Sequence, residues 1–192
     1  MKRVERSEIL DLGEYEKIRE HFRRRVIEEK KARRVAVGPH LTFLFENHDT
    51  VLLQIQEMLR TERITREAAV AHEIETYNEL LGAPGELGVT VMIEIAEPAE
   101  RDAFLVRAKG IERHLVLRVA GQDVRARWDD ARVLPDQASA VMYVKFAPGD
   151  AALSALRTGE ATVELVVDHP EAAATATLSR LTTKALAEDV AS

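Results

Sequence analysis

The sequence predicts an α+β protein in which N-terminal helices, including a helical hairpin, precede an antiparallel or mixed sheet of about five strands with helices on one face. Two observations predict this class. Up to about residue 85, apolar residues recur every three or four positions, as in amphipathic helices. From about residue 86 they alternate with polar residues, as in half-buried strands. We find no repeat or long linker, so residues 1–192 are expected to form a single domain with a helical half (about 7–85) and a sheet-rich half (about 86–192).

Composition excludes several classes of function. The net charge of −6 argues against broad attraction to nucleic acid or to anionic membranes. The chain has no cysteine, which excludes disulfides, thiolate metal sites and cysteine nucleophiles. No stretch approaches the ~18 apolar residues of a membrane helix, and the first residues do not resemble a signal segment. A cytoplasmic protein is therefore expected.

The first predicted helix covers residues 14–34. It carries one narrow apolar stripe formed by Tyr15, Ile18, Phe22 and Val26. Such a stripe could also pair with a second copy, so a homodimer through helix 14–34 is a further prediction. The basic residues of this helix are interleaved with glutamates, which favours a solvated, salt-bridged face and makes nucleic-acid binding an unfavoured alternative.

A helical hairpin is expected next. Residues 41–45 are predicted to be extended, and Asn47 or Asp49 can cap the helix that follows. A second helix, Thr65 to Leu81, stops at a Gly-Ala-Pro-Gly run. His72 and Glu75 have the spacing of a carboxylate-bridged iron site, but a helical wheel places them on the outer face, so we assign them to the surface.

The sheet-rich half contains five alternating segments. A tight turn at Ala120 to Asp123 joins two of them as a hairpin. The last helix is predicted over Pro170 to Asp189, with Pro170 just inside its start. The predicted strands are Val89–Ile95, Leu115–Val119, Val124–Trp128, Ser139–Phe146 and Ala161–Val167, and short helices are expected at 97–107 and between the last two strands.

The most polar corner of the chain lies between two apolar elements, at Glu46, Asn47, His48 and Asp49. If the strand continued to residue 48, Glu46 and His48 would share a face and could share a proton or bind a divalent ion. The alternative is that the corner only satisfies backbone amides at the helix start. Ligand or partner binding is assigned to this corner and to the half-buried flank of the following helix, at Glu46, Asn47, Asp49, Gln54 and Glu57.

No catalytic motif appears, so whether the protein is an enzyme stays open. Phosphate-binding glycine loops, nucleophile elbows and zinc-binding histidine pairs are all absent from the sequence. We expect no cofactor under the binding hypothesis. The alternative is a metal-binding protein or metal-dependent enzyme that holds Fe, Mn or Zn with the candidate ligands His40, Glu46, His48, Glu57 and His169.

Several segments resemble the signature of a bacterial family of uncharacterised proteins, a domain of unknown function. The segments that carry the resemblance are Phe45-Glu-Asn-His-Asp-Thr50, Gln54-Ile-Gln-Glu-Met-Leu-Arg60 and Glu62-Arg-Ile64. Tyr77-Asn-Glu-Leu-Leu81, Glu86-Leu87 and Val167-Asp-His-Pro170 fit the same family, so the resemblance covers nearly the whole chain.

The resemblance implies a setting rather than a reaction. Members of the family are expected beside rubrerythrin-like and iron–sulfur oxidoreductase proteins, which suggests an accessory role in redox or oxidative-stress chemistry. The family pattern often has arginine where this chain has His48, which implies that His48 is not an obligatory metal ligand. We therefore predict a cytoplasmic accessory or binding protein that works with such a partner.

Overall fold

In the computed structural model, residues 1–191 are described. They form six α-helices, three short 3-10 helices and nine strands. The α-helices are α1 (Leu12–Lys31), α2 (His48–Thr61), α3 (Glu67–Asn78), α4 (Pro98–Arg107), α5 (Asp150–Arg157) and α6 (Arg180–Ala191). The 3-10 helices are η1 (Arg6–Glu8), η2 (Ile111–His114) and η3 (Asp130–Arg132). No helix in this part of the chain has the length and apolar character needed to cross a membrane.

All strand pairs are antiparallel, and they make two sheets. The first sheet has the order β1 (Arg34–Val37), β2 (Leu41–Phe45), β3 (Leu87–Ile93), β7 (Val141–Phe146), β6 (Arg127–Trp128). The second has the order β5 (Gln122–Arg125), β4 (Leu115–Val119), β8 (Val163–Val167), β9 (Ala174–Thr177). The predicted α+β class, with helices before sheets, is confirmed, although the strands divide between two sheets where about five in one sheet were expected.

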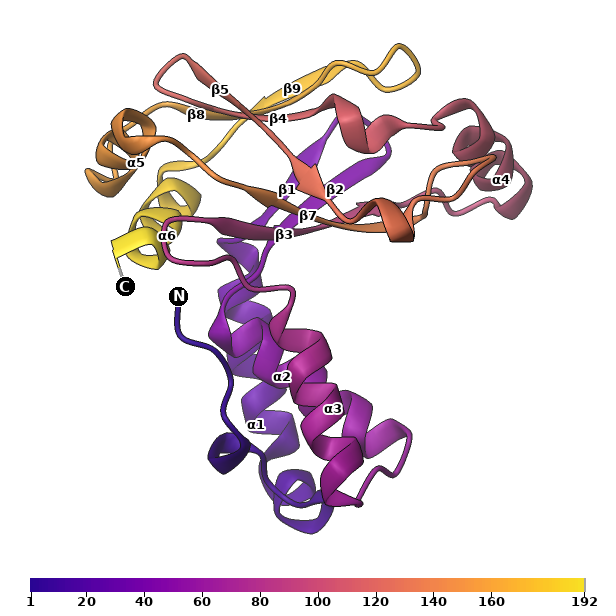
Figure 1. The fold of residues 1–192 in the computed structure, drawn as a ribbon, viewed down its shortest axis with the longest axis vertical. Helices are drawn as coiled ribbons and strands as arrows, with labels where there is room; N and C mark the ends of the chain where they lie inside the picture. The colour runs from indigo at the N-terminus through magenta and orange to yellow at the C-terminus, as the bar shows by residue number, and fades with distance from the viewer. Residues whose placement is uncertain (192) are drawn as a thin grey trace.

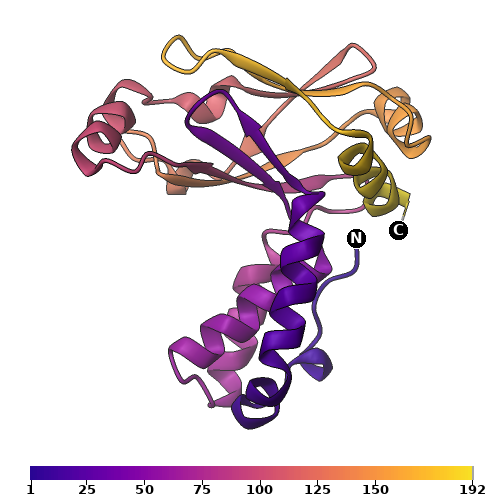
Figure 2. The ribbon, with the colours of Figure 1, turned by 180° about the vertical axis from the view of Figure 1, so that it is seen from behind.

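The two sheets form a body, and the first three helices form an arm that projects from it (Figure 1). The body encloses one large hydrophobic cluster built from the inward side chains of both sheets. The arm has a cluster of its own between α2, α3 and the N-terminal segment. Seen from behind, α1 runs the length of the arm and leads directly into the β1–β2 hairpin (Figure 2). The range 7–85 is therefore not wholly helical, because β1 and β2 belong to the body.

The arm joins the body at a close backbone contact. A side chain at Gly88 of β3 would meet the carbonyl oxygen of Leu80, just after α3, at 1.8 Å. The carbonyl of Gly88 also accepts a hydrogen bond of 2.9 Å from the backbone N–H of Glu46. Only glycine lets the end of the arm approach the sheet this closely.

The C-terminal part of the chain differs from the sequence prediction. The predicted helix from Pro170 to Asp189 begins only at Arg180, and Ala174–Thr177 forms strand β9 beside β8. The alternation of alanine and threonine in this segment is the strand period, and pairing with the edge of β8 outweighs the helix preference of alanine. The predicted hairpin after Val119 is confirmed, with a two-residue turn at Ala120 and Gly121, both at positive φ. The predicted returning strand Val124–Trp128 is instead divided between β5 of the second sheet and β6 of the first.

Candidate functional site

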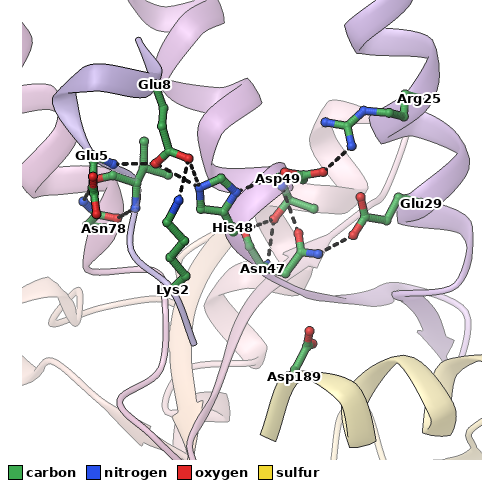
Figure 3. A network of polar contacts seen from close by, with 12 residues as sticks. Lys2, Glu5, Glu8, Arg25, Glu29, Asn47, His48, Asp49, Asn78 and Asp189 are labelled. Carbon is green, nitrogen blue, oxygen red and sulfur yellow. Dashed lines mark hydrogen bonds and ion pairs between the residues drawn. The ribbon is translucent and has the colours of Figure 1, made fainter. Parts of the chain in front are cut away.

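The predicted polar corner lies where the arm meets the body, between β2 and α2 (Figure 3). Asn47 caps α2: its side-chain oxygen accepts a hydrogen bond of 3.0 Å from the backbone N–H of Thr50, and Thr50 Oγ1 accepts one of 2.9 Å from the backbone N–H of Asn47. These reciprocal bonds satisfy free backbone groups at the start of the helix. The capping role considered for this corner is therefore present.

Glu46 lies under the corner and is 2% exposed. Its carboxyl group accepts hydrogen bonds from the hydroxyl of Thr90 at 2.6 Å and the side-chain amide of Gln54 at 3.2 Å. A third comes from the hydroxyl of Thr50. All three donors are uncharged, and they come from β3 and α2, so one buried carboxyl group ties the sheet to the helix.

His48 points away from Glu46. Its Nδ1 lies 3.0 Å from Asp49 Oδ1 and its Nε2 lies 3.0 Å from Glu8 Oε1, while Asp49 also pairs with Arg25 at 2.6 Å (Figure 3). Strand β2 ends at Phe45, so the alternation that would have brought residues 46 and 48 onto one face does not continue. The structure does not show the predicted Glu46–His48 pair; His48 belongs to a chain of polar contacts that starts at Lys2.

Glu8 connects Lys2 to His48 in this set of contacts. Burial favours its neutral form, but hydrogen bonds from Lys2, from the backbone N–H of Glu5 and from His48 outweigh this effect and lower the pKa of Glu8 to about 2. Lys2 Nζ lies 2.9 Å from the carboxylate. The N-terminal segment is thereby held against the start of α2.

A second group of charges connects the corner to the last helix. Asn47 Nδ2 donates to Glu29 of α1, and Glu29 lies 3.3 Å from Arg33. Arg33, only 5% exposed, binds Asp189 of α6 through two hydrogen bonds of 2.5 and 3.0 Å. Burial raises the pKa of Asp189, an effect that the Arg33 guanidinium opposes. This group links the arm to the C-terminal helix of the body.

Glu57 lies on α2 between the two long helices. It accepts hydrogen bonds from Arg19 at 2.8 and 2.9 Å and from the hydroxyl of Tyr15 at 2.7 Å. The Arg19 guanidinium, helped by Tyr15, lowers the pKa of Glu57 to about 2, despite partial burial. Burial, together with the bond to Glu57, raises the pKa of Tyr15. The predicted half-buried position of Glu57 is correct, and its polar atoms face α1.

The residues proposed as metal ligands lie in separate places. The His40 ring stacks edge-on against Phe104 with a centroid distance of 5.1 Å. His169 lies against His114 at 4.9 Å, with Nε2 3.3 Å from the carbonyl of Lys109. Within residues 1–191, no group of three or more His, Asp or Glu side chains is arranged to hold a metal ion. The geometry gives the Fe, Mn or Zn alternative no preformed site.

Two buried amides were missed by the sequence analysis. Gln56 binds the backbone N–H of Leu10 at 2.7 Å and its carbonyl at 3.3 Å. Asn78 binds both backbone groups of Val4 at 2.9 Å. Both amides lie beside apolar helix positions, which is the signal that could have identified them, because a buried amide needs partners. Together they fasten the N-terminal segment along the arm.

A protein-family comparison identifies the family of the chain. The family model described as "Protein of unknown function (DUF3501)" matches residues 3–190. The chain belongs to the DUF3501 family. The resemblance to a family of unknown function is thus confirmed, whereas its redox setting stays a prediction.

A solved structure agrees with this DUF3501 fold. A crystal structure of a novel protein of unknown function from Burkholderia pseudomallei is 34% identical and superposes with a TM-score of 0.92. The match covers 98% of this chain and 100% of that chain. No curated protein matches.

Proposed function

We propose that this DUF3501 protein is a non-catalytic accessory protein that docks a partner protein through its helical arm. The proposal rests on the contacts that the predicted site residues make within the chain. Glu46, Asn47, Asp49, Gln54 and Glu57 all direct polar atoms at partners within the chain, and these contacts hold the arm. Such an arrangement is more typical of a scaffold that holds the arm in place than of a catalytic site.

The arm supports docking because it projects from a body that has a separate core. Its outer helix, α1, has 20 residues and is therefore ~30 Å long. Ile18 and Ile27 of this helix are 45% and 49% exposed. At 100° per residue they lie on opposite sides of α1, so a substitution at each position tests a different side of this helix.

The proposed partner is a rubrerythrin-like or iron–sulfur oxidoreductase protein, as the family resemblance implies. Charge also favours an acidic partner, because α1 carries seven Lys or Arg residues and five glutamates in a chain of net charge −6. The stripe considered for a homodimer is less available, since Tyr15 and Val26 are fully buried within the chain.

The test is affinity capture from lysate of the source organism, with iron and mass-spectrometric analysis of what is retained. Wild-type protein should retain an iron-containing oxidoreductase at low salt and release it at high salt. Either Ile18→Asp or Ile27→Asp should lose the partner, which identifies the docking side. Leu181→Asp is the matched control, because Leu181 is 63% exposed but lies on α6 of the body.

Two results would contradict the proposal. Retention of the same partner by both isoleucine variants would exclude docking through α1. Stoichiometric Fe, Mn or Zn in chelator-free wild-type protein, with no retained partner, would instead support the metal alternative.

A further inference from the structure

A pocket in the body, away from the polar corner, contains a buried carboxyl group without a full set of partners. It has a volume of about 200 Å³ and lies between η2, η3 and strands β6 and β7. Glu112 of η2 lines it and is 5% exposed. Its Oε1 has no hydrogen-bond partner, and the Arg113 guanidinium Nε is 4.0 Å away, beyond hydrogen-bonding distance. A buried acceptor of this kind costs free energy unless a donor reaches it.

Glu112 has Arg113 as an ion-pair partner at 4.0 Å, and the other charged side chains at the pocket are paired elsewhere. Two other charged side chains line it, Asp129 and Arg132. They pair with each other at 3.4 Å, and Arg132 also pairs with Glu79 at 2.7 Å. The side chains that line the pocket therefore include two carboxylates and one guanidinium, that of Arg132, which is already paired and lies 5.8 Å from the centre of the Tyr143 ring.

Aromatic and apolar side chains form the walls together with the polar side chains of Gln137 and Ser139. Trp128 and Tyr143 line the pocket together with Val133, Leu134 and Met142. The indole N–H of Trp128 donates to Asp130 at 3.0 Å, which fixes the ring. Aromatic faces attract organic cations, and apolar walls favour a ligand with a hydrocarbon body.

We propose that this pocket binds an organic ammonium ion: its N–H groups donate to Glu112, and its apolar part lies between Trp128 and Tyr143. The inference is independent of docking through the arm, because the residues that line the pocket belong to the body. A second hollow of about 360 Å³ shares Trp128, Asp129, Arg132 and Tyr143 with the pocket. It gives space for a larger substituent on the ligand.

The test uses a matched pair of probes, phenethylamine and 2-phenylethanol, which differ in the cationic group. Trp128 is the only tryptophan of the chain, so intrinsic fluorescence reports directly on the pocket. The amine should give a saturable change with an affinity at least tenfold higher than the alcohol. Glu112→Gln should remove this preference, while Glu100→Gln, at an exposed position of α4, should retain it.

A second variant keeps the test decisive if Glu112→Gln folds poorly. Tyr143 is 41% exposed, so Tyr143→Leu should fold normally. It should weaken the amine and the alcohol by similar factors and keep the amine preference, because the phenyl group that both probes share is the part placed against Tyr143. Equal affinity for the two probes, no saturable change with either, or full amine preference in folded Glu112→Gln would overturn the proposal.

Discussion

At the scale of single residues, the most informative groups are polar side chains in apolar surroundings. Glu46, Gln56 and Asn78 are buried, and each has a hydrogen-bond partner in another part of the fold. A buried polar group stabilises the fold only while its partners are in place, so each one specifies which elements meet. These residues act as connectors between the arm, the N-terminal segment and the body.

Removing the Glu46 carboxyl group should be severely destabilising. Glu46→Ala leaves the hydroxyl of Thr90 and the amide of Gln54 without their acceptor and creates a cavity, so the free energy of unfolding should fall by about 3 kcal/mol. Urea unfolding measures this loss. Glu16→Ala is the control, because the exposed Glu16–Arg60 pair should leave the midpoint unchanged. A Glu46 variant as stable as the control would show that the carboxyl group is not a connector.

The ionisation of Glu57 should make stability depend on pH in the acid range. Its pKa in the folded protein is about 2, below the ordinary value of 4.5, so the folded state binds the proton less readily than the unfolded state. The stabilisation is complete above pH 4.5 and is lost as the pH falls towards 2. Glu57→Gln should therefore be less stable than wild type by about 1–2 kcal/mol at pH 7, with the difference shrinking towards pH 2. Urea midpoints across this range test it, and a difference that is constant with pH would contradict it.

At the scale of elements, α1 is attached to α2 mainly by polar contacts. We call these contacts the α1–α2 seam; they are Glu16–Arg60, Arg19–Glu57, Arg25–Asp49 and Glu29–Asn47. Only Tyr15 and Val26 of α1 are buried apolar or aromatic residues, and neither belongs to the hydrophobic cluster of the arm, against which α1 packs only Leu12 at its start. By contrast, α2 and α3 share that cluster. α1 is therefore expected to be the least stable helix of the arm.

Salt should loosen α1 selectively. High ionic strength screens ion pairs, the more exposed Glu16–Arg60 and Arg25–Asp49 pairs more than the half-buried Arg19–Glu57 pair, whereas apolar burial is not weakened by sodium chloride. Raising salt to ~1 M should accelerate hydrogen exchange in α1 (Leu12–Lys31) by several-fold and leave α2 (His48–Thr61) nearly unchanged. Hydrogen exchange with mass spectrometry resolves the two helices. Equal acceleration in both would show that the seam does not determine the stability of α1.

The sequence predicted elements better than their contacts. Apolar periodicity located the helices of the arm and most strands, because burial of one face imposes a local pattern. It failed at 174–177, where pairing with β8 makes a strand of a segment that was assigned to a helix. The polar corner was also located, but its contacts were not, since Glu8, Arg25 and Glu29 are far from it in sequence. Such long-range contacts leave no periodic signal.

At the scale of the whole molecule, the arm and the body have separate hydrophobic clusters joined by a polar junction. Burial of apolar side chains in one cluster does not directly stabilise the other cluster, so the arm and the body can unfold in separate steps. The junction is closed by backbone contact at Gly88, by the hydrogen bonds that Glu46 accepts from Thr90 and Gln54, and by the Arg33–Asp189 pair. The position of the arm relative to the body thus depends on this set of contacts.

Paired variants should separate the two parts. Asn78→Ala leaves both backbone groups of Val4 without a partner in the arm, and should lower the stability of the arm by about 2 kcal/mol. Leu117→Ala removes a fully buried side chain of the body, at a cost of about 3 kcal/mol. Hydrogen exchange should therefore accelerate in α2 and α3 for the first variant and in β3, β4 and β8 for the second. Acceleration of both parts by either variant would show that arm and body unfold as one cooperative unit, because only a shared transition transmits a local loss across the junction.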